Sequence, residues 1–280
     1  MPPPFDLGFM QRALLEVLLL SVPAGLLGSW IVLRRFAFFT HGVGTAAFPG
    51  LVVAGPLGVA PQIAAMASAA LYAFGLERLV RGRGVASDAA TGLLLIAALA
   101  LGVVLASDVF ESGSGIDRLL FGSLIGLNDL DLWLTAGAAL LVLVLDGLLY
   151  RNWLAEGFDA GGARRLGLRA RAGDALLLLT IALGAVVALA AVGALLVTAV
   201  FVIPAATVRM VAPSLTSLRA GAVALAAAEG VTALWLAYVL NVGPGPALAV
   251  LGGVVFAVVA AGCAIRDRLP RARLRPEPAA

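Results

Sequence analysis

The sequence contains no lysine, a single cysteine and a single histidine. The P-loop of an ATPase uses a lysine to reach the nucleotide phosphates, so this chain cannot supply a standard ATPase site. Because Cys263 stands alone, an internal disulfide and any Cys-x-x-Cys metal or redox motif are excluded. We therefore expect no enzyme activity from this chain and no cofactor bound by it.

Charged residues are also scarce. They make up 12% of the 280 residues, whereas 62% are hydrophobic, and a soluble domain carries about 25% charged residues. Apolar runs of about 20 residues recur along the chain, which is the length that a helix needs to cross a bilayer. Runs such as LLLIAALALGVVLA lack the alternation of barrel strands. The sequence therefore predicts an all-α, polytopic membrane helix bundle embedded in the lipid bilayer.

Hydropathy, together with the residues that interrupt the apolar runs, predicts about nine transmembrane helices. The expected spans are 9–33, 38–56, 58–79, 89–106, 130–150, 174–191, 193–211, 219–240 and 246–265. Segment 111–127 is too short and too charged to cross, so a re-entrant or interfacial piece fits it better. We expect a transmembrane domain over residues 1–265 and a cytoplasmic Arg/Pro-rich tail over 266–280.

The arginines predict the orientation of the bundle. All of them except Arg12 and Arg118 fall on one side if the N-terminus is outside, and basic residues mark the cytoplasmic side. We therefore expect a multi-pass protein of the cell (plasma or inner) membrane with a cytoplasmic C-terminus. Because the arginines lie at helix ends rather than on an aromatic-interleaved patch, we expect no nucleic-acid partner.

The only histidine, His41, lies near the start of the second expected span. Small residues recur there at four-residue spacing, at Gly42, Ala46 and Gly50. Small residues let membrane helices approach closely, and His41, Thr45 and Pro49 form the adjacent stripe. The imidazole is therefore expected beside a helix contact rather than facing lipid. Pro49 also frees a backbone carbonyl one turn earlier.

The acidic residues Glu16, Asp146 and Glu229 lie inside expected spans, and an ionisable group at the centre of a membrane helix costs at least about 2.5–3.5 kcal/mol. We expect Glu16 to pair with Arg12, one turn away on the same helix, and Asp146 to reach Arg151 near the inner surface. Glu229 is either a ligand on a solute path or a protonated acid bonded to a neighbouring helix.

The stretch AVGALLVTAVFVIPAATVRMVA, residues 191–212, carries a family resemblance. It resembles the permease subunit of ATP-binding-cassette transporters that import zinc, manganese and related divalent metals, the metal ABC-3 family. In that family a Val-Gly-x-Leu-Leu run leads to Ile-Pro-Ala-Ala-Thr-Ala-Arg at a helix end. The resemblance runs from about residue 13 to 262, through the further stretches LGSWIVLRRFAFF, FDAGGARRLGLRARAGDALLL and LAYVLNVGPGPALAVLGG.

The resemblance implies a complete importer around this chain. It implies a separate cytoplasmic ABC ATPase, an extracytoplasmic metal-binding protein, and a permease homodimer enclosing one path for zinc or manganese. On composition alone, residues 151–174 are either an arginine-rich loop that fixes topology or a docking segment. The resemblance favours a coupling segment for the ATPase at about 155–170. Its expected contact residues are Phe158, Asp159, Ala163, Arg164 and Gly167.

The chain departs from the family at the path. After the double arginine the family has Gly-Asp-x-x-x-His, but here His41 occupies the aspartate position and Thr45 the histidine position. A carboxylate with an imidazole suits a borderline divalent ion, whereas an imidazole with a hydroxyl is uncharged. His41, Thr45 and Glu229 are the candidate metal residues. A helix-end histidine bonded to a backbone carbonyl is the alternative for His41. A different solute such as a metal chelate, or a scaffold or ATP-independent carrier, is the alternative for the chain.

Overall fold

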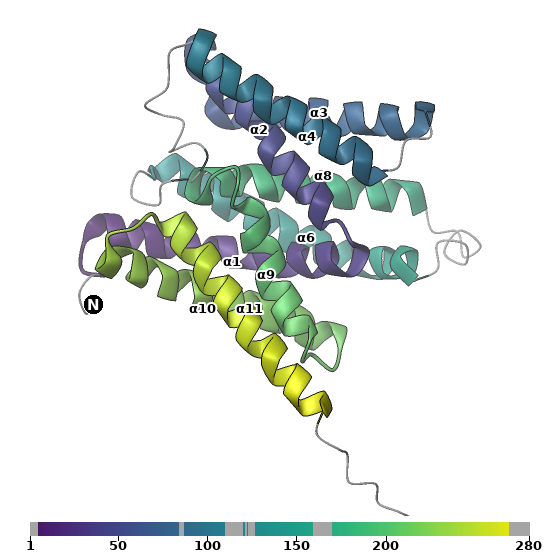
Figure 1. Cartoon of the computed structure of the whole chain (residues 1–280), viewed down its shortest axis with the longest axis vertical. Helices are drawn as coiled ribbons and strands as arrows, with labels where there is room; N and C mark the ends of the chain where they lie inside the picture. The colour runs from purple at the N-terminus through teal and green to yellow at the C-terminus, as the bar shows by residue number, and fades with distance from the viewer. Residues whose placement is uncertain are drawn as a thin grey trace, which may run out of the picture.

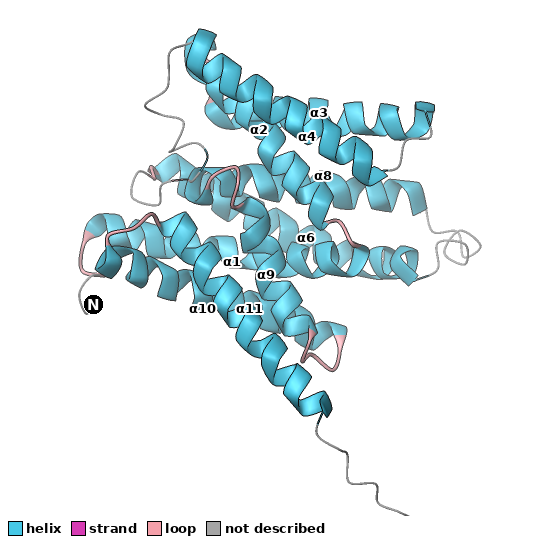
Figure 2. Cartoon of the chain, in the orientation of Figure 1, coloured by secondary structure: helices cyan, strands magenta, loops and turns pink. Residues whose placement is uncertain are grey.

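The computed structural model describes residues 5–83, 87–109, 120, 122, 127–158 and 170–268. Within these ranges the secondary structure is helical, as Figure 2 shows. The helices are α1 (Gly8–Arg34), α2 (Ala37–Leu57), α3 (Pro61–Arg83), α4 (Ser87–Val104) with the π-helical turn η1 (Leu105–Val109), α6 (Asp129–Phe158), α8 (Ala170–Val192), α9 (Val197–Arg209), α10 (Leu215–Leu240) and α11 (Pro244–Arg268). The all-α class is confirmed, and each expected span coincides with a helix.

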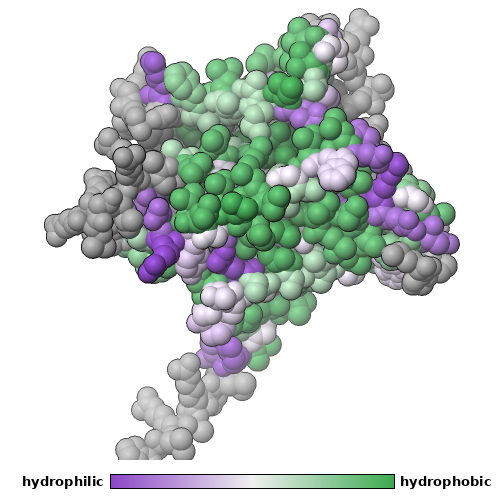
Figure 3. Space-filling model, turned by 180° about the vertical axis from the view of Figure 1, so that it is seen from behind, coloured by the Kyte–Doolittle hydropathy of each residue, from purple (hydrophilic) through white to green (hydrophobic). Residues whose placement is uncertain are grey.

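The helices fit a membrane protein in length and surface. In the described part of the chain, six are long and apolar enough to cross a bilayer, namely α1, α2, α4, α6, α10 and α11. The apolar stretches Pro61–Leu76 of α3, Ala175–Leu189 of α8 and Val197–Arg209 of α9 are shorter. Large apolar side chains are exposed along these helices, including Leu148 and Val250. Figure 3 shows a broad hydrophobic band with hydrophilic residues toward its edges. Such a belt is what hydrocarbon requires of a helix bundle.

Helix α1 lies in the middle of one half of the bundle. It packs against α6, α9 and α10, while α2, α3 and α4 form a second group that meets the first mainly through α8. In Figure 1, α1, α6, α8 and α10 run in roughly the same direction across the view, and α9 and α11 cross them obliquely. Gly28 of α1 lies against the Phe201 carbonyl of α9, where a Cβ atom would overlap the oxygen. The chain thus uses glycine to bring membrane helices into backbone contact.

The small-residue stripe of α2 is a helix contact, as predicted, and its partner is α3. A Cβ atom at Gly50 would overlap the Ala64 carbonyl. One turn earlier, Ser68 Oγ donates a hydrogen bond of 2.6 Å to the Ala46 carbonyl. This contact fixes which faces of α2 remain available to the rest of the bundle.

A buried ion pair joins α1, α6 and α10. Arg219 of α10 pairs with Asp146 of α6, and Trp30 Nε1 of α1 donates to Asp146 Oδ1 at 2.7 Å. The Arg219 guanidinium also lies 4.7 Å from the centre of the Tyr150 ring. The predicted Asp146–Arg151 pair is therefore wrong, because Asp146 faces the neighbouring helices and Arg151 is exposed.

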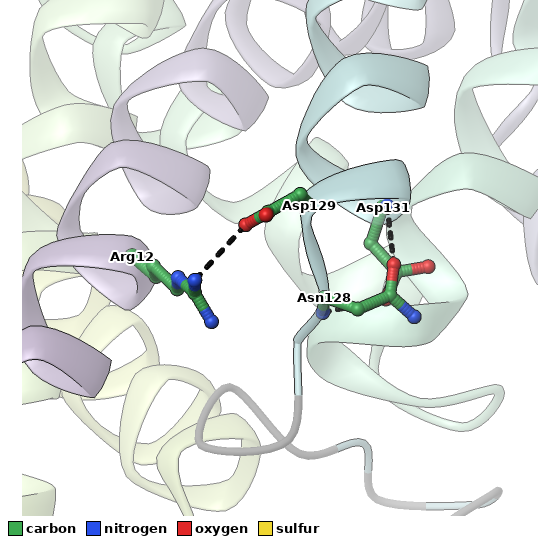
Figure 4. A network of polar contacts seen from close by, with 4 residues as sticks. All are labelled: Arg12, Asn128, Asp129 and Asp131. Carbon is green, nitrogen blue, oxygen red and sulfur yellow. Dashed lines mark hydrogen bonds and ion pairs between the residues drawn. The ribbon is translucent and has the colours of Figure 1, made fainter.

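The N-terminus of α6 is capped by its own side chains (Figure 4). Asp131 N donates to Asn128 Oδ1 at 3.0 Å, and Asn128 N donates to Asp131 Oδ2 at 3.1 Å. This reciprocal arrangement has the spacing of a capping box and satisfies helix N–H groups that lack intrahelical partners. Gln62 Nε2 of α3 donates to Asp131 Oδ1 at 3.0 Å, so the cap also ties α3 to α6.

Glu16 has a different partner from the one predicted. Arg12 pairs instead with Asp129 at 3.2 Å, at the start of α6 (Figure 4). Glu16 is fully buried and accepts a hydrogen bond of 2.7 Å from Thr135 Oγ1. The expected Glu16–Arg12 pair is wrong, because Arg12 reaches the exposed end of α6, whereas Glu16 faces the interior of the bundle.

Parts of three expected segments lie outside the described residues. Of segment 111–127, the structure describes residues 120, 122 and 127, and the Leu120 carbonyl accepts a hydrogen bond of 3.1 Å from Leu195 N. A Cβ atom at Gly122 would lie 2.5 Å from the Gly193 nitrogen. Residues 159–169 of the expected coupling segment and 269–280 of the expected tail are likewise outside.

Candidate metal path

The membrane segment that follows α8 is interrupted. Gly193 adopts a φ of 78°, in the left-handed region that favours glycine. Helix α9 then has 13 residues, or about 20 Å at the rise of an α-helix, against a hydrocarbon core of about 30 Å. The seventh expected span is therefore a shorter helix preceded by a turn. Non-helical backbone at membrane depth must be buried in protein or line a polar path.

Helix α2 covers this interruption with the face that carries His41 and Thr45. Gly44 lies between these residues in sequence, and a Cβ atom there would be 3.3 Å from the Ala194 carbonyl and 3.5 Å from Cβ of Val197. Residues three and four apart share a helix face. The predicted polar stripe of α2 thus lies against the start of α9.

His41 meets α9 through its ring. Its Nδ1 atom is 3.3 Å from Thr198 Oγ1, and the imidazole is half-buried. The partner that the structure gives this imidazole is a hydroxyl on another helix rather than the backbone carbonyl of the alternative interpretation. Sequence reasoning did not single out Thr198, although a polar residue at the start of a broken membrane helix is a usable signal.

The small residue beside His41 brings α3 close. A Cβ atom at Gly42 would overlap the Tyr72 hydroxyl. Tyr72 donates in turn to the Thr91 carbonyl at 3.3 Å. Polar groups from α2, α3 and α9 therefore gather around the start of α2.

Thr45 offers two oxygen acceptors one turn from His41. Its side chain is fully buried, and its Oγ1 atom has no hydrogen-bond partner among the described residues. Its carbonyl also lacks the usual helical donor, because Pro49 has no N–H. An unpaired buried polar atom requires a reason. A polar solute or water passing along this face would supply one.

Glu229 of α10 is buried elsewhere, on the side that meets α9 and α11. It is 4% exposed, and its Oε1 atom has no partner in the part of the chain that the structure describes. A Cβ atom at Gly252 would lie 3.4 Å from Glu229 Oε2 and 3.1 Å from Ile203 Cγ2. Within the described ranges, no three His, Cys, Asp or Glu residues form a group that could hold a metal ion. One copy of the chain thus presents His41 and Thr45 together and Glu229 apart.

Of the predicted coupling residues, the structure describes Phe158. It is the last residue of α6, and its side chain is 82% exposed. The others, Asp159, Ala163, Arg164 and Gly167, lie outside the described residues.

Comparison of the sequence with known proteins finds one family and several close relatives. The ABC 3 transport family matches residues 6–262. The manganese import system permease protein ScaB of Streptococcus gordonii is 30% identical over 253 residues, which cover 90% of this chain and 91% of that protein. The manganese transport system membrane protein MntC of Listeria innocua is 28% identical over 249 residues, 89% of each chain.

Solved structures share the fold. The chain is similar to PsaBC from Streptococcus pneumoniae, solved in complex with Fab, with a TM-score of 0.84, 27% identity and 91% of each chain covered. An inward-facing conformation of a putative metal-chelate type ABC transporter has a TM-score of 0.69 at 19% identity, covering 90% of this chain and 85% of that one. At that identity the second likeness concerns the fold alone.

Proposed function

Because the chain belongs to the ABC 3 transport family, we propose that it is the membrane-spanning subunit of an ATP-driven importer for a divalent metal ion. The family match over residues 6–262 carries this proposal. Manganese is the first candidate metal, because the relatives ScaB and MntC are named for manganese. Zinc is the second, because an imidazole ligand suits zinc well.

The metal passes along the face of α2 that carries His41 and Thr45. An imidazole nitrogen and neutral oxygens bind a divalent ion without adding charge, so the ion is held weakly. Weak binding suits a path, since a solute must be able to leave each site that it enters. Glu229 is the third metal residue of the proposal and acts at a separate point, beside α9 and α11. Two copies of the chain around one path would present two imidazoles.

A cytoplasmic ATPase and an extracytoplasmic metal-binding protein complete the importer. A cytoplasmic ATPase supplies the nucleotide site that a lysine-free chain lacks. It docks on the coupling segment at about residues 155–170, which begins near the exposed Phe158. An extracytoplasmic metal-binding protein delivers the ion. The arginine distribution supports an outside N-terminus and a cytoplasmic C-terminus.

A metal chelate is the second candidate solute. The observation in its favour is the chemistry of the α2 face, where His41 and Thr45 provide no carboxylate. A free manganese ion prefers carboxylate and other oxygen ligands, whereas a chelated metal brings its own.

Uptake of radioactive manganese by a deletion strain under metal limitation tests the proposal. We expect uptake to fall on deletion and to return with the wild-type chain. His41→Ala and Thr45→Val should each lower it at least about tenfold, equivalent to about 1.4 kcal/mol of lost binding. Thr40→Val is the matched control, because the Thr40 hydroxyl donates locally, to the carbonyl of Phe36 four residues earlier, at 2.9 Å. Unchanged manganese and zinc uptake in the deletion strain contradicts the proposal, and loss of chelate uptake alone favours the second candidate.

A further inference from the structure

We propose that Thr198 of α9 is a positioning residue for His41. Its hydroxyl oxygen accepts the Nδ1–H of the imidazole and so leaves the Nε2 lone pair available to the metal. The contact that carries this inference is the 3.3 Å separation of Thr198 Oγ1 from His41 Nδ1. The metal-binding role of Nε2 rests on the proposed function, but the hydrogen bond and the tautomer do not.

The interruption before α9 makes Thr198 available for this contact. Some threonines inside regular helices of this chain bond within their own helix: Thr180 and Thr207 donate to the carbonyl four residues earlier, at 2.6 and 2.8 Å. For Thr198 the residue four earlier is Ala194, which lies in the turn between α8 and α9 rather than in a helix. The Thr198 hydroxyl instead meets α2.

The two ring nitrogens of a neutral histidine have different roles. One carries the proton and donates, and the other has a lone pair that can bind a metal. A partner on one nitrogen therefore decides which nitrogen is left for a ligand. With Thr198 accepting at Nδ1, the free lone pair is on Nε2, on the far side of the ring from α9.

This arrangement also orients the ring. His41 is half-buried on a face shared with Thr45, whose Oγ1 atom has no partner among the described residues. A ring held at Nδ1 by α9 cannot swing freely toward lipid. The contact thus makes the direction of the imidazole depend on where α9 begins.

The single histidine makes the tautomer directly measurable. We would label histidine with nitrogen and carbon isotopes, place the full chain in lipid nanodiscs, and read the two ring-nitrogen chemical shifts at about pH 8, where an ordinary imidazole is neutral. The wild-type chain is expected to show a protonated Nδ1. Thr198→Val removes the acceptor and should shift the ring toward the Nε2–H form that prevails in water. Thr198→Ser keeps a hydroxyl and should restore the wild-type spectrum.

Thr207→Val is the control, because it removes a buried hydroxyl of the same helix whose partner is the Ile203 carbonyl, at 2.8 Å, rather than His41. A titration with zinc ion, which is diamagnetic, gives the second readout. Zinc affinity should fall by about 10–100-fold in Thr198→Val, the usual effect of removing a partner behind a metal-bound histidine. In Thr198→Ser it should stay close to the wild-type value.

Each result decides between the two proposals. A wild-type ring protonated at Nε2, or one whose spectrum is the same in Thr198→Val, overturns the positioning role even if His41 is needed for uptake. A tautomer that depends on Thr198 supports the positioning role. If zinc and manganese then leave the histidine signals unchanged, the proposed metal path fails while the hydrogen bond stands.

Discussion

Replacing Asp146 by asparagine removes the negative charge from the buried cluster that joins α1, α6 and α10. The Asp146 side chain is 2% exposed and that of its partner Arg219 is 20% exposed. Asparagine keeps an Oδ1 atom that can accept from Trp30 Nε1, a bond of 2.7 Å in the wild-type chain. The substitution therefore isolates the charge interaction from the hydrogen bond.

The magnitude follows from burial. Removing one partner of a buried ion pair costs about 3–5 kcal/mol, because the other charge is left uncompensated. The Arg219 guanidinium lies over the Tyr150 ring, 4.7 Å from its centre, and this contact is kept in the variant, so it does not change the difference in stability. We therefore expect a loss of about 3–5 kcal/mol, which corresponds to a Tm lowered by about 6–20 °C in a chain of this size.

The assay is thermal unfolding in detergent, followed by tryptophan fluorescence. Asp129→Asn on the same helix is the control, because it breaks an exposed ion pair. The Asp129 side chain is 73% exposed and that of its partner Arg12 is 53% exposed. An exposed pair contributes about 0–1 kcal/mol. The double variant Asp146→Asn with Arg219→Met should be more stable than Asp146→Asn alone, since it removes the unpaired charge as well. Equal Tm changes for Asp146→Asn and Asp129→Asn would refute the reasoning.

Two further substitutions test the packing and capping of the bundle. Gly28→Ala should lower the free energy of unfolding by about 1–3 kcal/mol, because the added Cβ atom would overlap the Phe201 carbonyl. Gly137→Ala is the control and should be neutral or stabilising, because nothing lies within 4 Å of its added Cβ atom. Equal Tm values for the two variants would contradict the close contact. Ser214→Ala removes the hydroxyl that accepts from Ser217 N at 3.2 Å and caps α10. It should cost about 1 kcal/mol, and an unchanged Tm would show that the cap contributes nothing.

The positions of the helices could be predicted because hydropathy and the residues that end helices are local properties of the sequence. The contact along Gly42, Ala46 and Gly50 was visible for the same reason, since four-residue spacing defines a helix face. The division near Gly193 was also predicted. The short length of α9 was not, because the apolar composition of 193–196 is the same in a turn as in a helix.

The partners of buried charges could not be predicted from spacing. Asp146 bonds Trp30 across 116 positions, and Glu16 bonds Thr135 across 119. Both predicted pairs were with residues within one or two turns on the same helix. Local neighbours are possible partners for a side chain at a helix surface, but a buried side chain faces whichever helix packs on it.

The same limit applies to the candidate site. The shared face of His41 and Thr45 follows from their spacing on α2. The contact with Thr198 spans 157 positions and depends on how α9 begins beside α2. It became visible only in the folded chain.

The most direct test of the proposed function is transport by the purified complex. The chain would be reconstituted in liposomes with its ATPase and its metal-binding protein, and the manganese content of the liposomes would be measured with and without ATP. ATP-dependent accumulation of manganese, absent when the chain is omitted, is the predicted result. An assembled complex that hydrolyses ATP but accumulates neither manganese nor zinc would contradict it.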